Sequence, residues 1–272
     1  MKLASCVLLP DSTAKIFAYR GDGLEKTLRD IAGIGYDGVQ LFLRDPDALN
    51  RSELDKLLQQ TGLEVCGIGT APLSAQDGLS LANKDPEKRE RAVKSAKKLI
   101  DFAANYGKIP LGIGKFRGGF AAGNRVEGWR WLREAFMELC DYASKKNVLV
   151  ALEPQEHIGI NNLNSTHDGV MWVEYIGAEN FGLLLDTYHM ELEDSSIMAG
   201  FVEAAGYLKH VHASDTDRLA PGKGKIDFTG VMRSLRAIGY KGYLSVEISQ
   251  PADAFAATQQ AWNHLNAVRN IY

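Results

Sequence analysis

Four residues that could bind a metal ion each follow a short apolar run in the second half of the 272-residue chain. They are Glu153, Asp186, His212 and Glu247. Their separations of roughly 26 to 35 residues are about the length of one strand and one helix in a parallel barrel. Three carboxylates and one imidazole suit Mn²⁺, Mg²⁺ or Co²⁺ better than a thiolate-bound metal, and zinc remains an alternative. The pattern predicts a site for one divalent metal ion.

Each of these residues has an ordinary alternative role when it is taken alone. A polar residue at the end of a strand can cap the next helix or pair with a nearby arginine or lysine. All four, however, come at the ends of consecutive predicted strands, and such strand ends meet on one face of a barrel, where barrel enzymes keep their active sites. We therefore prefer the metal site.

Other polar residues near these positions could contact or orient a substrate. His189 lies three residues after Asp186, and we expect it to rise above the metal toward whatever is bound there. Arg218 lies six residues after His212 in a loop, where its guanidinium could clamp substrate oxygens or pair with an acidic residue of the same loop. His210 points to the same side as His212 but one layer deeper, so we interpret it as an orienting residue and not as a ligand.

Short apolar runs alternate with longer amphipathic stretches along the chain, which is typical of strand and helix units in a parallel sheet. The predicted strands are 3–9, 38–43, 64–69, 109–116, 148–154, 181–187, 208–214 and 243–248. The helix signals are local. We expect one helix to end near Gly35, one to run through 85–107 with Pro86 in its first turn, and one to begin at Asp227.

Eight such units in about this length predict an α/β fold, a single (β/α)8 TIM barrel formed by residues 1–272 as one domain. The alternative is an open, doubly wound sheet. A nucleotide-binding sheet of that kind should carry GxGxxG directly after its first strand. Here PDSTAKIFAYRGDG follows that strand, so we place the open sheet second.

The composition is that of an ordinary globular protein, with 45% hydrophobic and 24% charged residues and a net charge of −3. This balance argues against binding to nucleic acid, which depends on clustered positive charge. Cys6, Cys66 and Cys140 lie far apart, and an odd number cannot all pair within the chain, so we expect a reducing, cytoplasmic location. No stretch approaches the roughly 18 apolar residues of a membrane helix, and no membrane association is expected.

The site residues and their surroundings resemble the xylose-isomerase-like TIM-barrel superfamily. The similarity is to its sugar isomerase and epimerase group, which includes ketose 3-epimerases, hydroxypyruvate isomerase and inosose-processing enzymes. The matching segments are LEP with Glu153, LLLDTYHM with Asp186 and His189, HVHASDTDRLAPGKGKIDF with His212 and Arg218, and LSVEI with Glu247.

The resemblance implies a divalent-metal-dependent sugar or sugar-phosphate isomerase or epimerase that works by proton transfer through a cis-enediolate. In that family the residues matching Glu153, Asp186, His212 and Glu247 hold one metal, and the two glutamates also serve as the catalytic acid and base. The metal then acts as a Lewis acid on the sugar oxygens. The expected partner is a small carbohydrate, and a homo-oligomer is an open alternative to a monomer.

One position departs from the family pattern. Ketose 3-epimerases commonly carry another glutamate six residues after the one matching Glu153, and this sequence has Gly159 there. Glu156 and His157 are the polar residues that the same segment offers for contact with the substrate. The departure puts a free-ketose 3-epimerase in doubt but leaves the metal chemistry untouched.

Three other functions remain as alternatives. A nuclease of the endonuclease IV type is disfavoured, since it needs additional histidines after the third and fourth strands that this chain lacks. A metal-dependent lyase, dehydratase or hydrolase could use the same residues, and a sugar-binding barrel without activity is the third. A phosphate on the substrate could be met by Arg117, Lys223 or Lys225, although each could equally face solvent.

Overall fold

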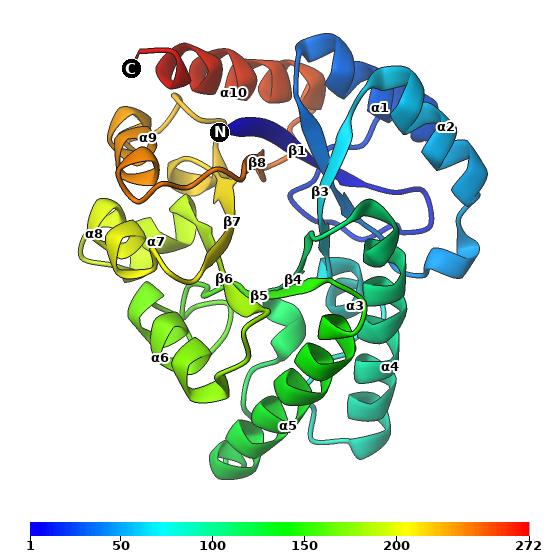
Figure 1. The fold of residues 1–272 in the computed structure, drawn as a ribbon, viewed down its shortest axis with the longest axis vertical. Helices are drawn as coiled ribbons and strands as arrows, with labels where there is room; N and C mark the ends of the chain where they lie inside the picture. Colours follow the sequence, from blue (N-terminus) through cyan, green and yellow to red (C-terminus); the bar gives the residue numbers. More distant parts are fainter. Residues whose placement is uncertain (272) are drawn as a thin grey trace.

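Eight parallel strands close into a barrel in the computed structural model, which describes residues 1–271 (Figure 1). The strands are β1 Lys2–Leu8, β2 Gly38–Phe42, β3 Glu64–Gly69, β4 Pro110–Ile113, β5 Leu149–Leu152, β6 Phe181–Asp186, β7 Leu208–Ala213 and β8 Tyr243–Val246. Each strand pairs with the next along the chain, and β1 also pairs with β8. The predicted (β/α)8 barrel is confirmed, and the open sheet is excluded.

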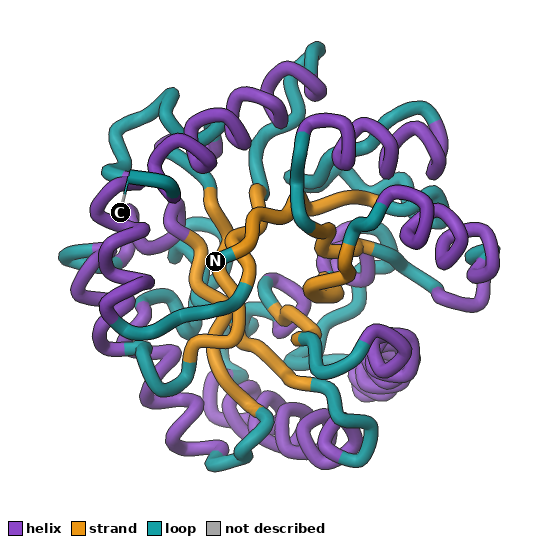
Figure 2. The backbone as a smooth tube through the Cα atoms, turned by 45° about the horizontal axis from the view of Figure 1, so that its top comes forward, coloured by secondary structure: helices purple, strands orange, loops and turns teal. Residues whose placement is uncertain are grey.

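Helices surround the ring of strands on the outside (Figure 2). The α-helices are α1 Gly23–Ile34, α2 Arg51–Thr61, α3 Ala71–Ala75, α4 Pro86–Ala103, α5 Arg125–Ser144, α6 Thr166–Ile176, α7 Thr187–Glu193, α8 Ile197–Glu203, α9 Phe228–Ala237 and α10 Ala254–Arg269. Short 3₁₀ turns are η1 Pro46–Ala48, η2 Ala104–Tyr106, η3 Lys115–Arg117 and η4 Thr216–Arg218. Within residues 1–271, no helix combines the length and the apolar character needed to cross a bilayer.

The helix ends that we predicted from Gly35, Asp227 and Pro86 are observed in the structure. Gly35 ends α1 with a left-handed φ of 110°, and its backbone lies so close to α10 that a Cβ there would come within 2.7 Å of the Trp262 ring. The side chain of Asp227 caps α9 by accepting a hydrogen bond from the Gly230 N–H. Pro86 lies in the first turn of α4, where its missing N–H costs no helical hydrogen bond.

Most strands are somewhat shorter than predicted, and the two largest differences, in the fourth and fifth strands, have local causes. The fourth strand ends at Ile113 instead of residue 116, because Lys115–Arg117 turns into the helix η3. The fifth strand ends at Leu152 instead of residue 154. Pro154 has no N–H to donate to a neighbouring strand, which is consistent with this earlier end.

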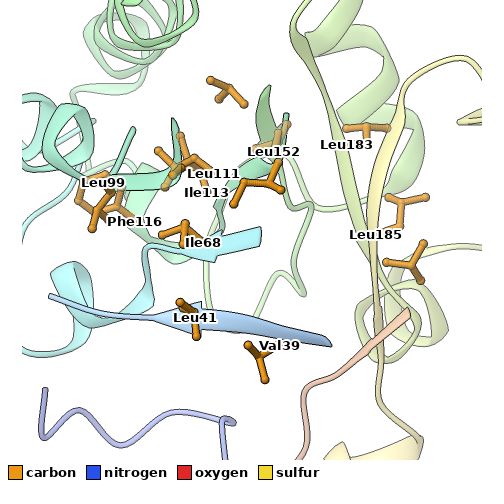
Figure 3. Close-up of a cluster of buried hydrophobic side chains, with 14 of the residues drawn as sticks. Val39, Leu41, Ile68, Leu99, Leu111, Ile113, Phe116, Leu152, Leu183 and Leu185 are labelled. Atoms are coloured by element: carbon orange, nitrogen blue, oxygen red, sulfur yellow. The ribbon is translucent and has the colours of Figure 1, made fainter. Parts of the chain in front are cut away.

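Alternate strand residues fill the space between the barrel and its helices. Val39 and Leu41 of β2 and Leu183 and Leu185 of β6 are almost completely buried, in one large cluster with Leu99 of α4 (Figure 3). Burying each such side chain contributes about 1.5–3 kcal/mol to folding. This layer fixes the strands, and therefore the strand ends, in place.

Many of the intervening residues of the strands are small or polar, although Leu184 of β6 also lies on this inner side. Gln40 lies between Val39 and Leu41, and His212 follows Val211 of β7. Gly112 of β4 leaves room for the Leu184 side chain, whose Cδ1 would lie 3.0 Å from a Cβ at that position. The sequence thus places polar groups inside the barrel, near the carboxyl ends of its strands.

Candidate metal centre and substrate cavity

The four predicted metal ligands lie together at the carboxyl ends of neighbouring strands. Glu153 follows β5 directly, Asp186 is the last residue of β6, His212 belongs to β7 and Glu247 follows β8 directly. Each offers one ligand atom, and these atoms all lie within 4.8 Å of one another. The structure therefore brings together the four residues that the sequence pattern selected.

Their spacing fits a single ion. His212 Nδ1 lies 3.1 Å from Glu153 Oε1, 3.7 Å from Asp186 Oδ2 and 3.5 Å from Glu247 Oε2. Adjacent ligands of an ion with bonds of about 2.1 Å lie about 3 Å apart in an octahedron and about 3.4 Å apart in a tetrahedron. Both the donor set and its dimensions suit a divalent metal.

Charge pairing keeps this buried cluster ionised. Burial by itself would raise the pKa of Asp186, but Arg218 and His212 hold that pKa below its usual value. Burial likewise opposes ionisation of Glu153, but the hydrogen bond with His212 and the charges of His212 and His189 together lower the pKa of Glu153. For His212, burial acts to lower the pKa, while Glu247 and Asp186 raise it well above its usual value.

Gln40 orients the ligand histidine. Its Oε1 lies 2.7 Å from His212 Nε2, and an amide oxygen can only accept, so Nε2 carries a proton. Nδ1 is then the nitrogen that faces the carboxylates. Ligand histidines in metal sites are commonly fixed in this way through their second nitrogen. The sequence analysis missed Gln40, although an amide within the apolar run GVQLFL was a usable signal.

Arg218 lies beside the four predicted metal ligands and pairs with two of them. Its Nη1 donates to Asp186 Oδ2 at 2.5 Å and to Glu247 Oε2 at 2.9 Å. Its guanidinium is flanked by the rings of Phe17 and Tyr188, at 4.8 and 4.6 Å from their centres. The backbone φ of Arg218 is 60°, a conformation that is strained for a residue with a side chain.

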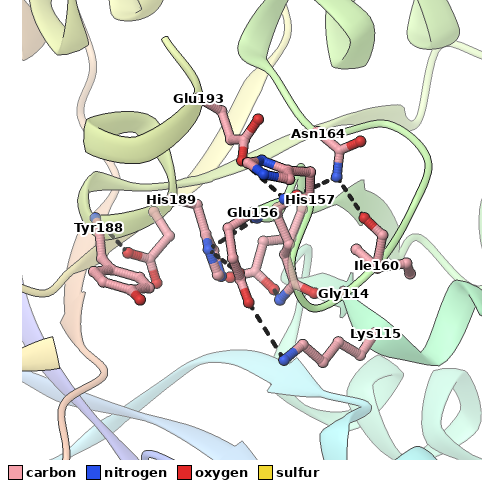
Figure 4. A network of polar contacts seen from close by, with 12 residues as sticks. Gly114, Lys115, Glu156, His157, Ile160, Asn164, Tyr188, His189 and Glu193 are labelled. Atoms are coloured by element: carbon pink, nitrogen blue, oxygen red, sulfur yellow. Dashed lines mark hydrogen bonds and ion pairs between the residues drawn. The ribbon is translucent and has the colours of Figure 1, made fainter. Parts of the chain in front are cut away.

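His189 is buried and contacts both Arg218 and Glu156, and Figure 4 shows its ring beside Glu156. Its Nε2 is 2.7 Å from Arg218 Nη2, and because a guanidinium only donates, Nε2 must accept. Nδ1 lies 2.6 Å from Glu156 Oε2 and 3.2 Å from the backbone nitrogen of Glu156. Burial acts to raise the pKa of Glu156, but His189 and Lys115 together lower it to about 2.

Gly159 provides the space for this arrangement. A Cβ at residue 159 would lie 2.4 Å from Glu156 Oε1 and 2.8 Å from Lys115 Nζ. Lys115 Nζ itself is 3.6 Å from Glu156 Oε1, and both residues line the cavity (Figure 4). Residue 159 therefore has no carboxylate of its own, and Glu156 supplies a carboxylate to this part of the cavity instead.

His157 lies away from the position that we expected. Its side chain is 70% exposed and pairs with Glu193, with Nδ1 and Oε1 2.7 Å apart. It is not among the residues that line the cavity, because the chain turns outward at Glu156 and His157 (Figure 4). Contact between His157 and a substrate is therefore not supported.

His210 occupies the deeper layer that its spacing predicts. Its Nε2 lies 2.8 Å from Ser245 Oγ, and its ring stands edge-on to His212, 5.7 Å away between centres. Burial and the neighbouring His212 hold the pKa of His210 well below its usual value. It packs beneath the ligand histidine and is not one of the four clustered ligands.

The three cations considered for phosphate binding do not reach the cavity. Arg117 is completely buried, and all its hydrogen bonds go to backbone carbonyls and to Asn162. Lys223 and Lys225 are exposed and lie outside the cavity lining. The cations that do line the cavity are Lys15, Lys115 and Arg218.

A cavity of about 320 Å³ opens above the metal ligands. Its lining combines polar groups, including Glu153, His212 and Glu247, with the apolar rings of Phe17 and Phe42. Its histidines are His189 and His212, so no additional histidine from β3 or β4 is available for a cluster of several metals. A larger hollow, of about 650 Å³, lies at the other end of the strands and contains none of the four ligands.

Residues 28–267 match the xylose isomerase-like TIM barrel family. The chain belongs to this family. A probable ketose 3-epimerase from Synechocystis sp. is 26% identical over 227 residues, which cover 82% of this chain and 77% of that protein.

Two solved structures are similar over nearly the whole chain. The 3-keto-D-glucoside 4-epimerase from E. coli has a TM-score of 0.83 and 21% identity, covering 98% of this chain and 99% of that one. The IOLI protein, solved with a bound zinc atom, has a TM-score of 0.77 and 19% identity, covering 100% of this chain and 99% of that one. At these identities the structural matches establish the shared fold.

Proposed function

We propose that the protein is a metal-dependent sugar epimerase or isomerase. The observation that carries the proposal is the cluster of Glu153, Asp186, His212 and Glu247, with all four ligand atoms within 4.8 Å, beside a cavity that three of them line. The name of the Synechocystis relative, a probable ketose 3-epimerase, supports the same reaction class.

The reaction moves a proton on the carbon next to a carbonyl group. Glu153 and Glu247 are the acid and base, because they are the two glutamates of the cluster and both line the cavity. A divalent ion held by the four residues would polarise the carbonyl and hydroxyl oxygens of the sugar. Return of the proton to the opposite face gives epimerisation, and its return to the neighbouring carbon gives isomerisation.

His189 and Arg218 bind and orient the sugar. His189 lines the cavity, where a sugar hydroxyl could take the place of Arg218 Nη2 as the donor to its Nε2. The guanidinium of Arg218 supplies donors to sugar oxygens from between two aromatic rings. We further propose an unphosphorylated substrate, because two of the three lining cations are already paired, Lys115 with Glu156 and Arg218 with Asp186 and Glu247, which leaves Lys15 alone to meet a phosphate.

The metal is proposed to be Mn²⁺, Mg²⁺ or Co²⁺, with zinc as an alternative. Three carboxylates and one imidazole suit all of these ions. The cysteines are free and buried, in keeping with our expectation of a cytoplasmic enzyme.

The test is deuterium exchange in D₂O with Mn²⁺ or Mg²⁺ and a panel of free and phosphorylated ketoses, aldoses and 2-oxo acids. We expect uptake at one carbon of an unphosphorylated sugar, detected by mass spectrometry. Uptake should stop with a chelator and fall at least roughly 100-fold in Glu247→Gln. The labelled carbon separates epimerase from isomerase.

The matched control is Glu193→Gln, which removes a carboxylate from a histidine pair outside the cavity and should exchange at the wild-type rate. Absence of exchange in the metal-loaded wild type across the panel would argue for a lyase, a hydrolase or a sugar-binding protein on the same barrel.

A further inference from the structure

The amide of Gln155 contacts one of the proposed catalytic glutamates from within the cavity wall. Gln155 is 7% exposed and lines the cavity. Its side-chain amide donates to Glu153 Oε2 at 2.6 Å, while Glu153 Oε1 faces His212. Oε2 of Glu153 is therefore held by Gln155, whereas Oε1 is directed toward His212.

Chemistry fixes the orientation of the Gln155 amide. An ionised carboxylate only accepts hydrogen bonds, so the NH₂ group must face Glu153 and the carbonyl oxygen must point elsewhere. That oxygen, Oε1, is buried and has no hydrogen-bond partner among residues 1–271. Almost all buried polar atoms of native proteins have a partner, so an orphaned acceptor in a cavity wall points to a missing donor.

The surrounding chain holds Gln155 firmly in this position. Its backbone carbonyl accepts from Asn164 Nδ2 at 2.6 Å, and its N–H donates to the Leu163 carbonyl. A Cβ on Gly114 would lie 2.3 Å from Glu153 Oε2 and 2.6 Å from Gln155 Nε2. The glycine at the end of β4 therefore makes room for the contact between Glu153 and Gln155, which is a sign of a preorganised site.

We propose that Gln155 positions Glu153 through its NH₂ group and accepts a hydrogen bond from a substrate hydroxyl through Oε1. This inference rests on the proposed sugar chemistry and narrows the substrate class. The sugar must carry a free hydroxyl beside the carbon whose proton Glu153 moves, because Gln155 lies directly against that carboxylate. An analogue that lacks this hydroxyl leaves the buried oxygen unpaired and is rejected.

Two measurements on Gln155→Leu test the inference. Calorimetric titration of chelator-treated protein with Mn²⁺ should show affinity reduced about 10- to 100-fold, since the variant no longer holds Glu153 in place. Deuterium exchange is then measured with ketohexoses and with their 1-deoxy and 4-deoxy analogues. For one of these pairs, the kcat/KM of the wild type should be roughly 10- to 100-fold higher with the parent sugar than with its deoxy analogue. In Gln155→Leu this preference should shrink to less than about threefold.

Gln250→Leu is the matched control. Gln250 also donates its NH₂ group within the protein, to the Ile248 carbonyl, and also has an Oε1 without a partner among residues 1–271. It does not line the cavity, so its replacement should change neither measurement. Gln155→Met, which keeps an unbranched side chain, serves as a second variant if the leucine disturbs folding.

The outcomes separate this inference from the proposed function. If the wild type exchanges deuterium and Gln155→Leu keeps the full preference for the parent sugar, the role in recognition is wrong. An equal loss on both sugars likewise overturns it, since that is the result of a merely structural role. If the wild type binds Mn²⁺ but exchanges no sugar, the proposed function fails, and the Mn²⁺ affinity of Gln155→Leu still decides whether Gln155 holds Glu153.

Discussion

The contacts of Glu156 with His189 and Lys115 should make stability depend on acidic pH. The pKa of Glu156 falls from its ordinary 4.5 to about 2 in the folded protein, so its ionisation contributes stability that is complete above about pH 4.5. That contribution is lost as the pH falls toward 2. Measured by urea unfolding, the difference in free energy between wild type and Glu156→Gln should decrease steadily from about pH 6 to about pH 3.5.

Glu193→Gln is the control for this prediction. Its partner His157 is largely exposed, and exposed pairs contribute little to stability, so the variant should differ little from wild type at each pH. A difference for Glu156→Gln that stays constant with pH would contradict the lowered pKa of Glu156.

The sequence could predict residues whose position in the chain determines their position in space. Asp186 and Glu247 come directly at strand ends, and parallel strands necessarily bring their ends together. Gln155 and His157 lie in a loop, where the direction of each side chain depends on contacts that no sequence pattern encodes. One of them lies in the cavity wall and the other faces solvent.

At the scale of the elements, Arg117 joins the segments that carry the site. From η3, its guanidinium donates to the Gly114 and Glu153 carbonyls and to three oxygens of Asn162 and Leu163. Burial acts to lower its pKa, to about 10, so it remains charged at neutral pH. It therefore links the ends of β4 and β5 with the loop before α6.

Replacing this arginine should be strongly destabilising. Arg117→Met removes five buried hydrogen bonds, and only the Gly114 and Leu163 carbonyls keep another donor within residues 1–271, so we expect a loss of about 3–5 kcal/mol in the free energy of unfolding by urea. Arg117→Lys should recover only part of it, since an ammonium cannot reach all five oxygens. Lys115→Met, in the same short helix but half exposed, should cost less than about 1 kcal/mol, and an equal cost for both methionine variants would refute the structural role.

The elements were predictable where local chemistry determines them. Caps and glycines such as Asp227 and Gly35 set helix ends through neighbouring residues alone. The end of β4 was not predictable, because GIGKF continues the apolar pattern and only the burial of Arg117 turns the chain into η3. From the sequence, Arg117 was a loop cation whose charge suggested contact with a substrate phosphate. In the structure its guanidinium instead holds neighbouring loops together through hydrogen bonds.

Considered as a whole molecule, the barrel concentrates its proposed chemistry in one half. The four predicted ligands come from β5 to β8 or directly follow them, whereas β2 to β4 contribute Gln40 and small or apolar groups to the lining of the cavity. A metal ion would therefore connect four consecutive strands at their carboxyl ends. Without the ion, Arg218 and His212 already balance the carboxylates, so we expect the protein to stay folded in the presence of a chelator.

Binding of the metal should raise the melting temperature of a protein that is already folded. An ion that binds the folded state alone, at one hundred times its Kd, adds about 2.7 kcal/mol, which corresponds to a rise of about 5–10 °C for a chain of this size. Differential scanning calorimetry with and without Mn²⁺ measures this rise. Asp186→Asn should abolish most of it, because the ion loses one of its three carboxylates, whereas Glu193→Gln should retain it. An unchanged melting temperature for the wild type at saturating Mn²⁺, Mg²⁺, Co²⁺ and Zn²⁺ would mean that the four side chains do not form a metal site, and that Arg218 is their permanent partner.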